Sequence, residues 1–202
     1  MQPFTIVTGA AAPMPAANID TDVIMPKQFL KGIDRSGLRD GTFHELRFDP
    51  SGGERTDFIL NREAWRAAQF LVVGPNFGCG SSREHAVWGL SQRGIRALIG
   101  TSFAGIFFDN CARNGLPVIT IDEDSVKALT DLATDPKTNR FTVDLPRQTI
   151  ATTDGRIFSF DIEPERRDAL ILGLDAIGTT LQRRDAIVSF ETSYLRQNPW
   201  LV

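Results

Sequence analysis

Short apolar runs alternate with helix-forming stretches through the middle of this chain. Three apolar, partly β-branched runs have the length and composition of buried strands. They are residues 69–73, 95–99 and 117–121. A helical pattern follows each run, at residues 81–93, 103–113 and 125–132. Strands and helices that alternate through short links form a parallel or mixed sheet. We therefore expect an α/β protein with a mixed sheet covered by helices.

The N-terminal third is expected to be less regular. We predict a short strand at residues 4–7, an alanine- and proline-rich loop, and a short helix that begins at Pro26. Residues 32–57 are rich in Gly, Asp and Ser and predict one long loop. A strand at 56–60 and a short helix at 61–67, capped by Asn61, complete the segment.

The C-terminal third changes character. Residues 140–162 hold three alternating β segments, with a hairpin turn at Asp154 and Gly155. Residues 166–174 and 175–194 are predicted helices, and we expect Trp200 to pack on the body of its own chain. The expected organisation is a single domain over residues 1–202 with a C-terminal helical extension.

Composition excludes several classes of function. The 202 residues are 42% hydrophobic and 23% charged, as in ordinary globular proteins, with a net charge of −3. No apolar run approaches the roughly 20 residues of a membrane span, and the N-terminus does not resemble a signal peptide. Basic residues do not alternate with aromatic ones as on a nucleic-acid-binding surface. We expect a cytoplasmic protein that binds neither membrane nor nucleic acid.

Metal-binding capacity is low. The two cysteines, Cys79 and Cys111, lie 32 positions apart, and the two histidines are His44 and His85. Two thiols cannot hold a four-cysteine zinc site or an iron–sulfur cluster. We expect no metal in this chain.

The sequence GPNFGCGSSREHAVWGL at residues 74–90 combines a strand end, a glycine loop and a helix start. Glycines such as Gly80 are needed where φ is positive or where a ligand approaches closely. Helix amides with their dipole favour an anion at such a loop. Two interpretations remain open: Ser81 or Ser82 caps the helix, or the loop is a functional site. Arg83 favours the second, because its guanidinium matches a carboxylate and a cap needs no arginine.

Three segments together carry a family resemblance. NIDTDVIMPKQFL (18–30), GPNFGCGSSREHAVWGL (74–90) and SFAGIFFDNCARNGLP (102–117) resemble the small subunit of 3-isopropylmalate dehydratase, and the likeness covers nearly the whole chain. GSSREH alone is similar to the wider aconitase superfamily, whose swivelling β/β/α domain the chain would represent. The resemblance implies isomerisation of 2-isopropylmalate and 3-isopropylmalate through 2-isopropylmaleate, in leucine biosynthesis. It also implies a large partner subunit that holds a [4Fe–4S] cluster as Lewis acid, and a small dicarboxylic acid as substrate.

The resemblance also implies roles for individual residues. Ser81, the first serine of the motif, would be the catalytic base, activated as an alkoxide by the helix amides and Arg83. Arg83 would bind a substrate carboxylate. Ser82 would supply an amide, with helix capping as the alternative. Asp22 matches an aspartate near the active site, although an Asx-turn would place it there for local reasons. Gly80 would support the loop.

Other positions are assigned more loosely. Lys31, or Lys27, would replace a carboxylate-binding arginine of aconitases, and a solvated lysine is the alternative. His85 is expected to be structural. An apolar pocket for the isopropyl group would need Ile33 or Leu38 near Ser81.

Two rival functions follow. One is the small subunit of a related hydro-lyase for homoaconitate or citraconate-type acids. The other is a non-catalytic regulatory swivel domain, for which Ser81 would be dispensable.

Overall fold

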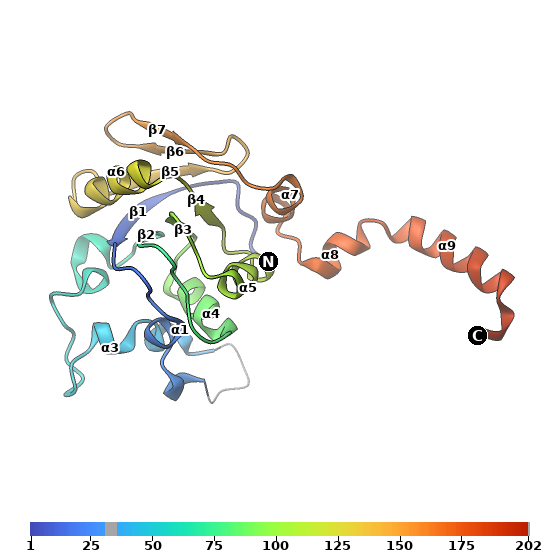
Figure 1. The fold of residues 1–202 in the computed structure, drawn as a ribbon, viewed down its shortest axis with the longest axis horizontal. Helices are drawn as coiled ribbons and strands as arrows, with labels where there is room; N and C mark the ends of the chain where they lie inside the picture. The colour runs from blue at the N-terminus through green and yellow to red at the C-terminus, as the bar shows by residue number, and fades with distance from the viewer. Residues whose placement is uncertain (31–35, 202) are drawn as a thin grey trace.

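The computed structural model describes residues 1–30 and 36–201, which contain a seven-stranded mixed sheet (Figure 1). The strand order is β4-β3-β2-β1-β5-β6-β7. The strands are β1 (Ile6–Met14), β2 (Phe70–Val73), β3 (Ala97–Gly100), β4 (Val118–Thr120), β5 (Arg140–Asp144), β6 (Thr149–Thr152) and β7 (Ile157–Ser159). Strands β1 to β4 pair in parallel, and β5 to β7 continue the sheet antiparallel from the other side of β1. The predicted mixed sheet is confirmed.

Strand β1 is longer than the sequence suggested. The predicted strand at 4–7 is correct only for residues 6 and 7, and the loop predicted after it is wrong, because residues 6–10 pair with β5 and residues 11–14 pair with β2. Pro13 is tolerated within the strand. The Ala11 N–H donates toward Asn139, just before β5 begins, and the N–H of residue 13 would point the same way, beyond the β5 pairing. Proline there removes no ladder hydrogen bond.

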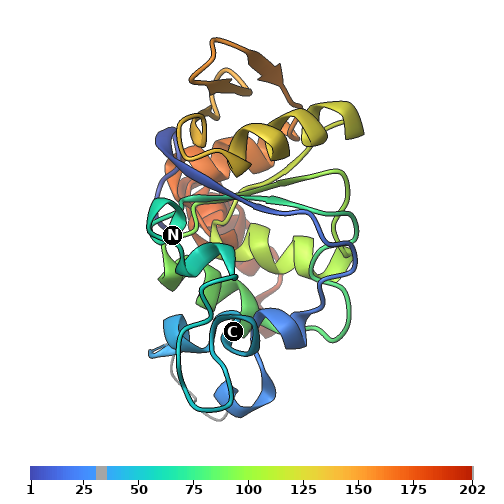
Figure 2. The same cartoon turned by 90° about the vertical axis from the view of Figure 1, so that its left-hand side faces the viewer.

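Helices cover both faces of the sheet, as expected. Helices α4 (Glu84–Arg93) and α5 (Gly105–Asn114) lie on one face and α6 (Glu123–Thr134) on the other, which Figure 2 shows as three layers. Alternate residues of β2 point to opposite faces, so Leu71 and Val73 join the α4–α5 core while Phe70 and Val72 join the α6 core. Strands β5 and β6 contribute to the α6 core as well.

Local sequence signals explain how the elements in this half begin and end, and the predicted turn at Asp154 and Gly155 is confirmed. Gly115 ends α5 with a left-handed φ of 73°. The Asp122 side chain caps α6 by accepting from the Ser125 N–H at 2.8 Å. Residues Asp154 and Gly155 turn the chain between β6 and β7.

The segment before β2 departs from the prediction. Helix α1 (Thr21–Ile24) and the 3-10 turn η1 (Lys27–Phe29) are followed by α2 (Leu38–Gly41) and α3 (His44–Arg47), where one long loop was expected. The strand predicted at 56–60 is wrong, since the chain turns there into η2 (Ile59–Asn61). A 3-10 turn, η3 (Glu63–Trp65), replaces the helix expected at 61–67.

The side chain of Asn61 explains this last difference. Asn61 is buried, and its Nδ2 donates to the carbonyls of Arg47 at 2.7 Å and Arg55 at 2.9 Å. The Asn61 side chain therefore holds the backbone of residues 47–55 by hydrogen bonds and does not cap a following helix.

After β7 the chain leaves the sheet and the helices packed on it, which together we call the body. Helix α7 (Pro164–Leu172) packs on the body, whereas α8 (Ala176–Leu181), α9 (Arg184–Gln197) and η4 (Pro199–Leu201) project away from it (Figure 1). We call residues 176–201 the arm. The continuous helix predicted at 175–194 is broken between α8 and α9. Trp200 is 74% exposed, so the expectation that it packs on its own body is wrong.

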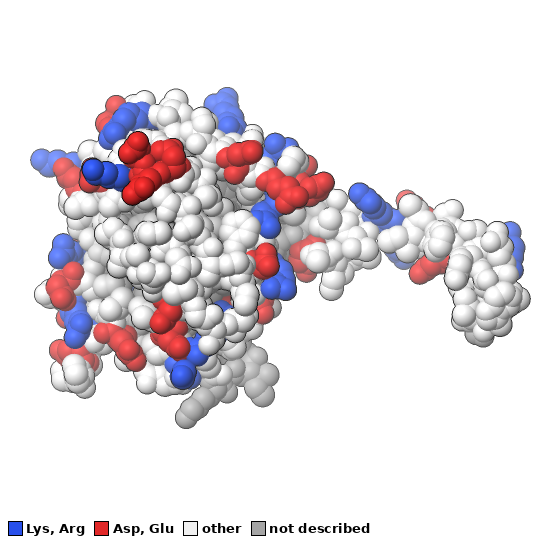
Figure 3. All heavy atoms as spheres, in the orientation of Figure 1, with Lys and Arg blue, Asp and Glu red and all other residues white. Residues whose placement is uncertain are grey.

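Charged side chains of both signs are scattered over the face seen in Figure 3. No helix within the described residues is both long enough and apolar enough to span a membrane.

Candidate active site

The loop between β2 and α4, residues 74–83, has an irregular backbone with several positive φ angles. Asn76, Gly78 and Gly80 have φ values of 57°, 78° and 88°. A Cβ at position 78 would overlap the Phe107 ring of α5, so only glycine fits there. At Gly80 the nearest atom to such a Cβ is 3.4 Å away, and glycine is needed for φ alone. The predicted supporting role of Gly80 has this physical basis.

The NIDTD segment lies alongside this loop, although about 60 positions separate them in the sequence. The Gly78 N–H donates to the carbonyl of Ile19 at 2.7 Å, and the Thr21 N–H donates to that of Cys79 at 2.9 Å. The buried Thr21 hydroxyl donates to the Ser81 carbonyl at 2.8 Å. Two of the motifs quoted above therefore form one structural unit, and Thr21, which the sequence did not single out, connects them.

Ser81 and Ser82 are exposed and lie before the helix. Helix α4 begins at Glu84, three residues later than predicted, and its N-cap position is Arg83, with no side-chain capping hydrogen bond. The alternative in which Ser81 or Ser82 caps this helix is wrong. The left-handed Gly80 and the extended backbone of Arg83 (φ −134°, ψ 103°) keep both serines outside the first turn. The first-turn amides of α4 are left without a side-chain acceptor, beside two exposed hydroxyls.

Arg83 and Asp22 form an ion pair between the two segments. Arg83 Nη1 contacts Asp22 Oδ1, and the two side chains are 12% and 44% exposed. The side chain that caps α1 is that of Asp20, which accepts from the Val23 N–H at 2.8 Å, whereas the Asp22 carboxylate pairs with Arg83. The structure thus brings together two predicted site residues, and Asp22 fixes the guanidinium of the residue that follows the two serines.

The third motif supports the start of α4 from α5. The Asn114 side chain donates to Glu84 Oε1 at 2.7 Å and accepts from Trp88 Nε1 at 2.8 Å. The His85 ring packs against Trp88, with 4.7 Å between ring centroids. These contacts fix the direction of α4 and agree with a structural part for His85.

A cavity of about 320 Å³ lies beside the NIDTD segment. It is lined by Asp20, Asp22, Val23, Pro26, Lys27, Gln28 and Glu45. Lys27 is exposed at its rim, and Asp22 connects the cavity to Arg83. The other basic candidate, Lys31, and the pocket candidate Ile33 lie outside the described residues. Leu38 is buried in the core beside Gly89, more than one helical turn from Ser81, so it does not line a pocket there.

Two buried arginines, which sequence reasoning missed, connect the elements of this region: Arg93 joins α4 to η2, and Arg47 joins α3 to η2. Arg93 Nη2 donates to the Leu60 carbonyl at 2.9 Å, and Arg47 Nε donates to Asn61 Oδ1 at 3.4 Å. Burial lowers the pKa of Arg47 and lowers that of Arg93 to about 10. Both guanidinium groups donate hydrogen bonds to backbone or amide oxygens, and their role is to stabilise the packing of these elements.

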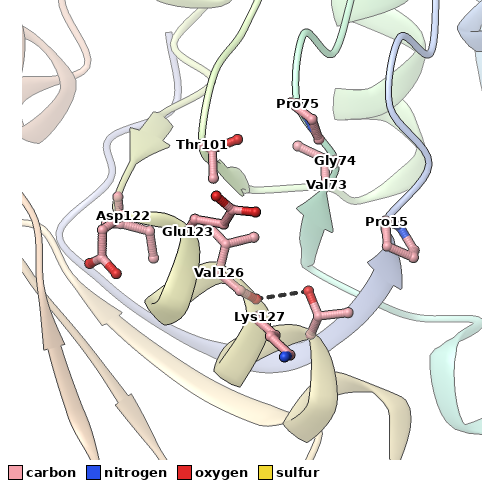
Figure 4. Close-up of a pocket in the computed structure, with 11 residues that line it drawn as sticks. Pro15, Val73, Gly74, Pro75, Thr101, Asp122, Glu123, Val126 and Lys127 are labelled. Carbon is pink, nitrogen blue, oxygen red and sulfur yellow. Dashed lines mark hydrogen bonds between the residues drawn. The ribbon is translucent and has the colours of Figure 1, made fainter.

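A larger cavity, of about 570 Å³, lies elsewhere. It sits where the parallel strands end, against the first half of α6, and Figure 4 shows Thr101, Asp122, Glu123 and Lys127 around it. None of the predicted site residues in the described part of the chain lines it. Cavity size alone would therefore have pointed away from the serines.

The cysteines do not form a metal site. Cys111 is fully buried, and burial raises the pKa of its thiol, whereas Cys79 lies in the loop. Among residues 1–30 and 36–201 no group of three or more His, Cys, Asp or Glu side chains is arranged to hold a metal ion.

Comparisons with known families and proteins agree with one another. The model of the aconitase C-terminal domain matches residues 1–124, and a model described as LeuD_N matches residues 127–164. A third model, which describes the C-terminal domain of the 3-isopropylmalate dehydratase small subunit, matches residues 177–202.

Individual relatives match over their full length. The chain is 58% identical to 3-isopropylmalate dehydratase small subunit 1 of Mannheimia succiniciproducens, over 100% of this chain and 99% of that protein. It is 49% identical to 3-isopropylmalate dehydratase small subunit of Roseobacter denitrificans, over 100% of both. A solved structure of 3-isopropylmalate dehydratase from Methanocaldococcus jannaschii is 25% identical, with a TM-score of 0.67 over 93% of this chain and 99% of that one.

Proposed function

Because this chain belongs to the family of 3-isopropylmalate dehydratase small subunits, we propose that it supplies one half of a dehydratase active site, with Ser81 as the catalytic base. The reaction is the isomerisation of 2-isopropylmalate and 3-isopropylmalate by dehydration and rehydration through 2-isopropylmaleate, a step of leucine biosynthesis in the cytoplasm. The second half of the site belongs to a large subunit.

The observation that carries the Ser81 assignment is its position before an uncapped helix. Ser81 is exposed, and its carbonyl accepts a hydrogen bond from the Thr21 hydroxyl. The backbone amides of the first turn of α4 follow in the chain, and no side chain caps them. Taking a proton from the carbon next to a carboxylate needs a strong base, and an alkoxide is strong enough only when its charge is stabilised. Helix amides and a neighbouring guanidinium supply that stabilisation.

Arg83 is proposed to bind a substrate carboxylate. Its ion pair with Asp22 occupies Nη1 and orients the side chain, and a guanidinium has four further N–H donors. Ser82 is proposed to contribute its amide to the same carboxylate. Lys31 keeps its proposed role at a second carboxylate, with Lys27 at the rim of the 320 Å³ cavity as the other basic candidate.

The residues of this chain do not fit the [4Fe–4S] cluster. The two thiols are far apart in sequence, and Cys111 is enclosed in the core with a raised pKa, which opposes the thiolate that a cluster needs. We place the cluster in the large subunit, where it would supply a Lewis acid for the leaving hydroxyl. The part of this chain is to bind carboxylates and to hold and move the proton at Ser81 Oγ.

The test is reconstitution with the large subunit and assay on 2-isopropylmalate. Ser81→Ala should lower kcat by about 10²–10⁴-fold with little change in KM, because the base acts in the transition state. Ser82→Ala is the matched control and should keep most of the turnover. Near-normal kcat for Ser81→Ala would remove the base assignment and favour a non-catalytic swivel domain.

The related hydro-lyase for homoaconitate or citraconate-type acids is not favoured, since the curated relatives quoted above are named for 3-isopropylmalate. Parallel assays of the assembled complex on each acid separate the two functions.

A further inference from the structure

The arm, residues 176–201, exposes most of the large apolar side chains on the described surface. The large hydrophobic residues that are exposed on the body are scattered over different elements. They are Met1, Ile6, Ile106, Ile157 and Leu172. Those of the arm follow one another along its helices. They are Ile177, Leu181, Ile187, Val188, Phe190, Tyr194, Leu195, Trp200 and Leu201. Exposed apolar side chains that gather on one segment in this way indicate an interaction site.

Helix α9 places three apolar residues on one face, while Val188 and Leu195 lie to one side of it, beyond Glu191. Ile187, Phe190 and Tyr194 follow the three- and four-residue spacing of one face, and the rings of Phe190 and Tyr194 stack with 5.5 Å between centroids. The opposite face carries Asp185, Ser189, Thr192 and Arg196 at the same spacing. An amphipathic helix with one apolar face is the form that binds in a hydrophobic groove of a partner.

We infer that the apolar face of the arm docks in a hydrophobic groove of the large subunit. This inference rests on the proposed heteromeric function. The arm has the size of one side of a standard interface, which uses roughly 20–30 residues. It also corresponds to residues 177–202, the segment that matches the family model for the C-terminal domain of the small subunit.

A second copy of this chain fits less well as the occupant. The described body has no run of exposed apolar residues long enough to receive α9. The cavity of about 570 Å³ against α6 is lined in part by Asp122, Glu123 and Lys127, and it can hold only a few side chains. A second copy would therefore have to receive α9 on its own arm, which the self-association measurement below detects. Figure 3 shows that the outer end of the arm is mostly uncharged, as a surface that binds in a hydrophobic groove requires.

The experiment measures binding of the purified full-length chain to the purified cluster-bearing large subunit from the same organism. The test variant is Phe190→Ser with Tyr194→Ser, and the matched control is Thr192→Ser with Arg196→Ser on the opposite face. Serine has a helix propensity close to those of Phe and Tyr, so the test variant keeps its helix, which circular dichroism checks. Because the arm contributes no buried residue, the body should unfold at the same urea concentration in both.

The test variant should bind the large subunit at least about 100-fold more weakly, and the control within about threefold of the wild type. At saturating large subunit the test variant should regain the wild-type kcat. Equal binding by the test variant and the wild type would overturn the inference. So would self-association of the wild type that the test variant abolishes while its binding to the large subunit is unchanged.

Failure of this inference is distinguishable from failure of the proposed function. Ser81→Ala should bind the large subunit normally and fail only in turnover. If Ser81→Ala is active but the arm variant cannot assemble, the base assignment fails and the docking surface stands. If the arm variant assembles normally and Ser81→Ala is inactive, the docking surface fails and the base assignment stands.

Discussion

Replacing Thr21 by valine should separate the positioning of Ser81 from the stability of the chain. Thr21 is 2% exposed, and its hydroxyl donates to the Ser81 carbonyl at 2.8 Å while its N–H donates to Cys79. Valine keeps the shape and the backbone hydrogen bond but removes the hydroxyl donor. Loss of one such bond should lower the free energy of unfolding by about 1 kcal/mol.

The effect on catalysis should be larger. Without the Thr21 hydroxyl the loop is held at Cys79 but not at Ser81, and a displacement of a catalytic group by about 1 Å can cost about 100-fold. We expect Thr21→Val to lower kcat by roughly 10- to 100-fold in the reconstituted complex, with KM changed less than about threefold.

Thr21→Ser is the matched control. It keeps the hydroxyl and loses a buried methyl, which costs about 0.8 kcal/mol. The two variants should therefore lose similar stability in urea titrations, and only the valine variant should lose kcat. A wild-type kcat for Thr21→Val at full assembly would refute the reasoning, because the hydroxyl would then serve folding alone.

Two further predictions concern stability. Gly78→Ala should destabilise the chain by more than about 2 kcal/mol in urea unfolding, because the new Cβ overlaps Phe107 and φ is positive, whereas Gly80→Ala should cost about 1 kcal/mol from φ alone; equal losses would contradict the packing argument. The hydrogen bonds from Ser125 hold the pKa of Asp122 below its usual 3.8, so its charge stabilises the fold above that pH and this contribution is lost as the pH falls through the folded-state pKa. Asp122→Asn keeps a side-chain oxygen that can cap the helix, but this side chain does not titrate. The Tm of the variant should therefore be lower than that of the wild type near neutral pH, and the difference should shrink below pH 3.8. A difference in Tm that stays constant with pH would show that the charge of Asp122 plays no part.

Sequence reasoning succeeded where the determining signals are local. The alternation of strands and helices after residue 69 and the hairpin turn at Asp154 and Gly155 depend on residues within a few positions of one another. It failed for β1, whose alanine and proline residues have weak strand propensity. That strand exists because β2 and β5, distant in sequence, pair with it on either side.

The serines show the same limit within the site. Ser81 and Ser82 have the residue type and position of helix caps, and local rules favour that interpretation. Their actual position depends on Thr21 and Asp22, about 60 residues earlier, which hold the loop and Arg83. The family resemblance named Asp22 and Arg83 separately, but no sequence pattern indicated that they contact each other. Thr21 could have been suspected only from its place between two aspartates in NIDTD.

The separation of the arm from the serine loop has a consequence for how two subunits share a site. The arm points away from the body in Figure 1, whereas the loop and α1 lie on the body itself. In the proposed complex, the arm would hold the large subunit near the serine loop independently of the contacts at the site itself. Assembly of the site would then be an intramolecular step at high effective concentration. Removing apolar side chains from the arm should therefore raise the concentration of large subunit needed for activity and leave kcat at saturating large subunit unchanged.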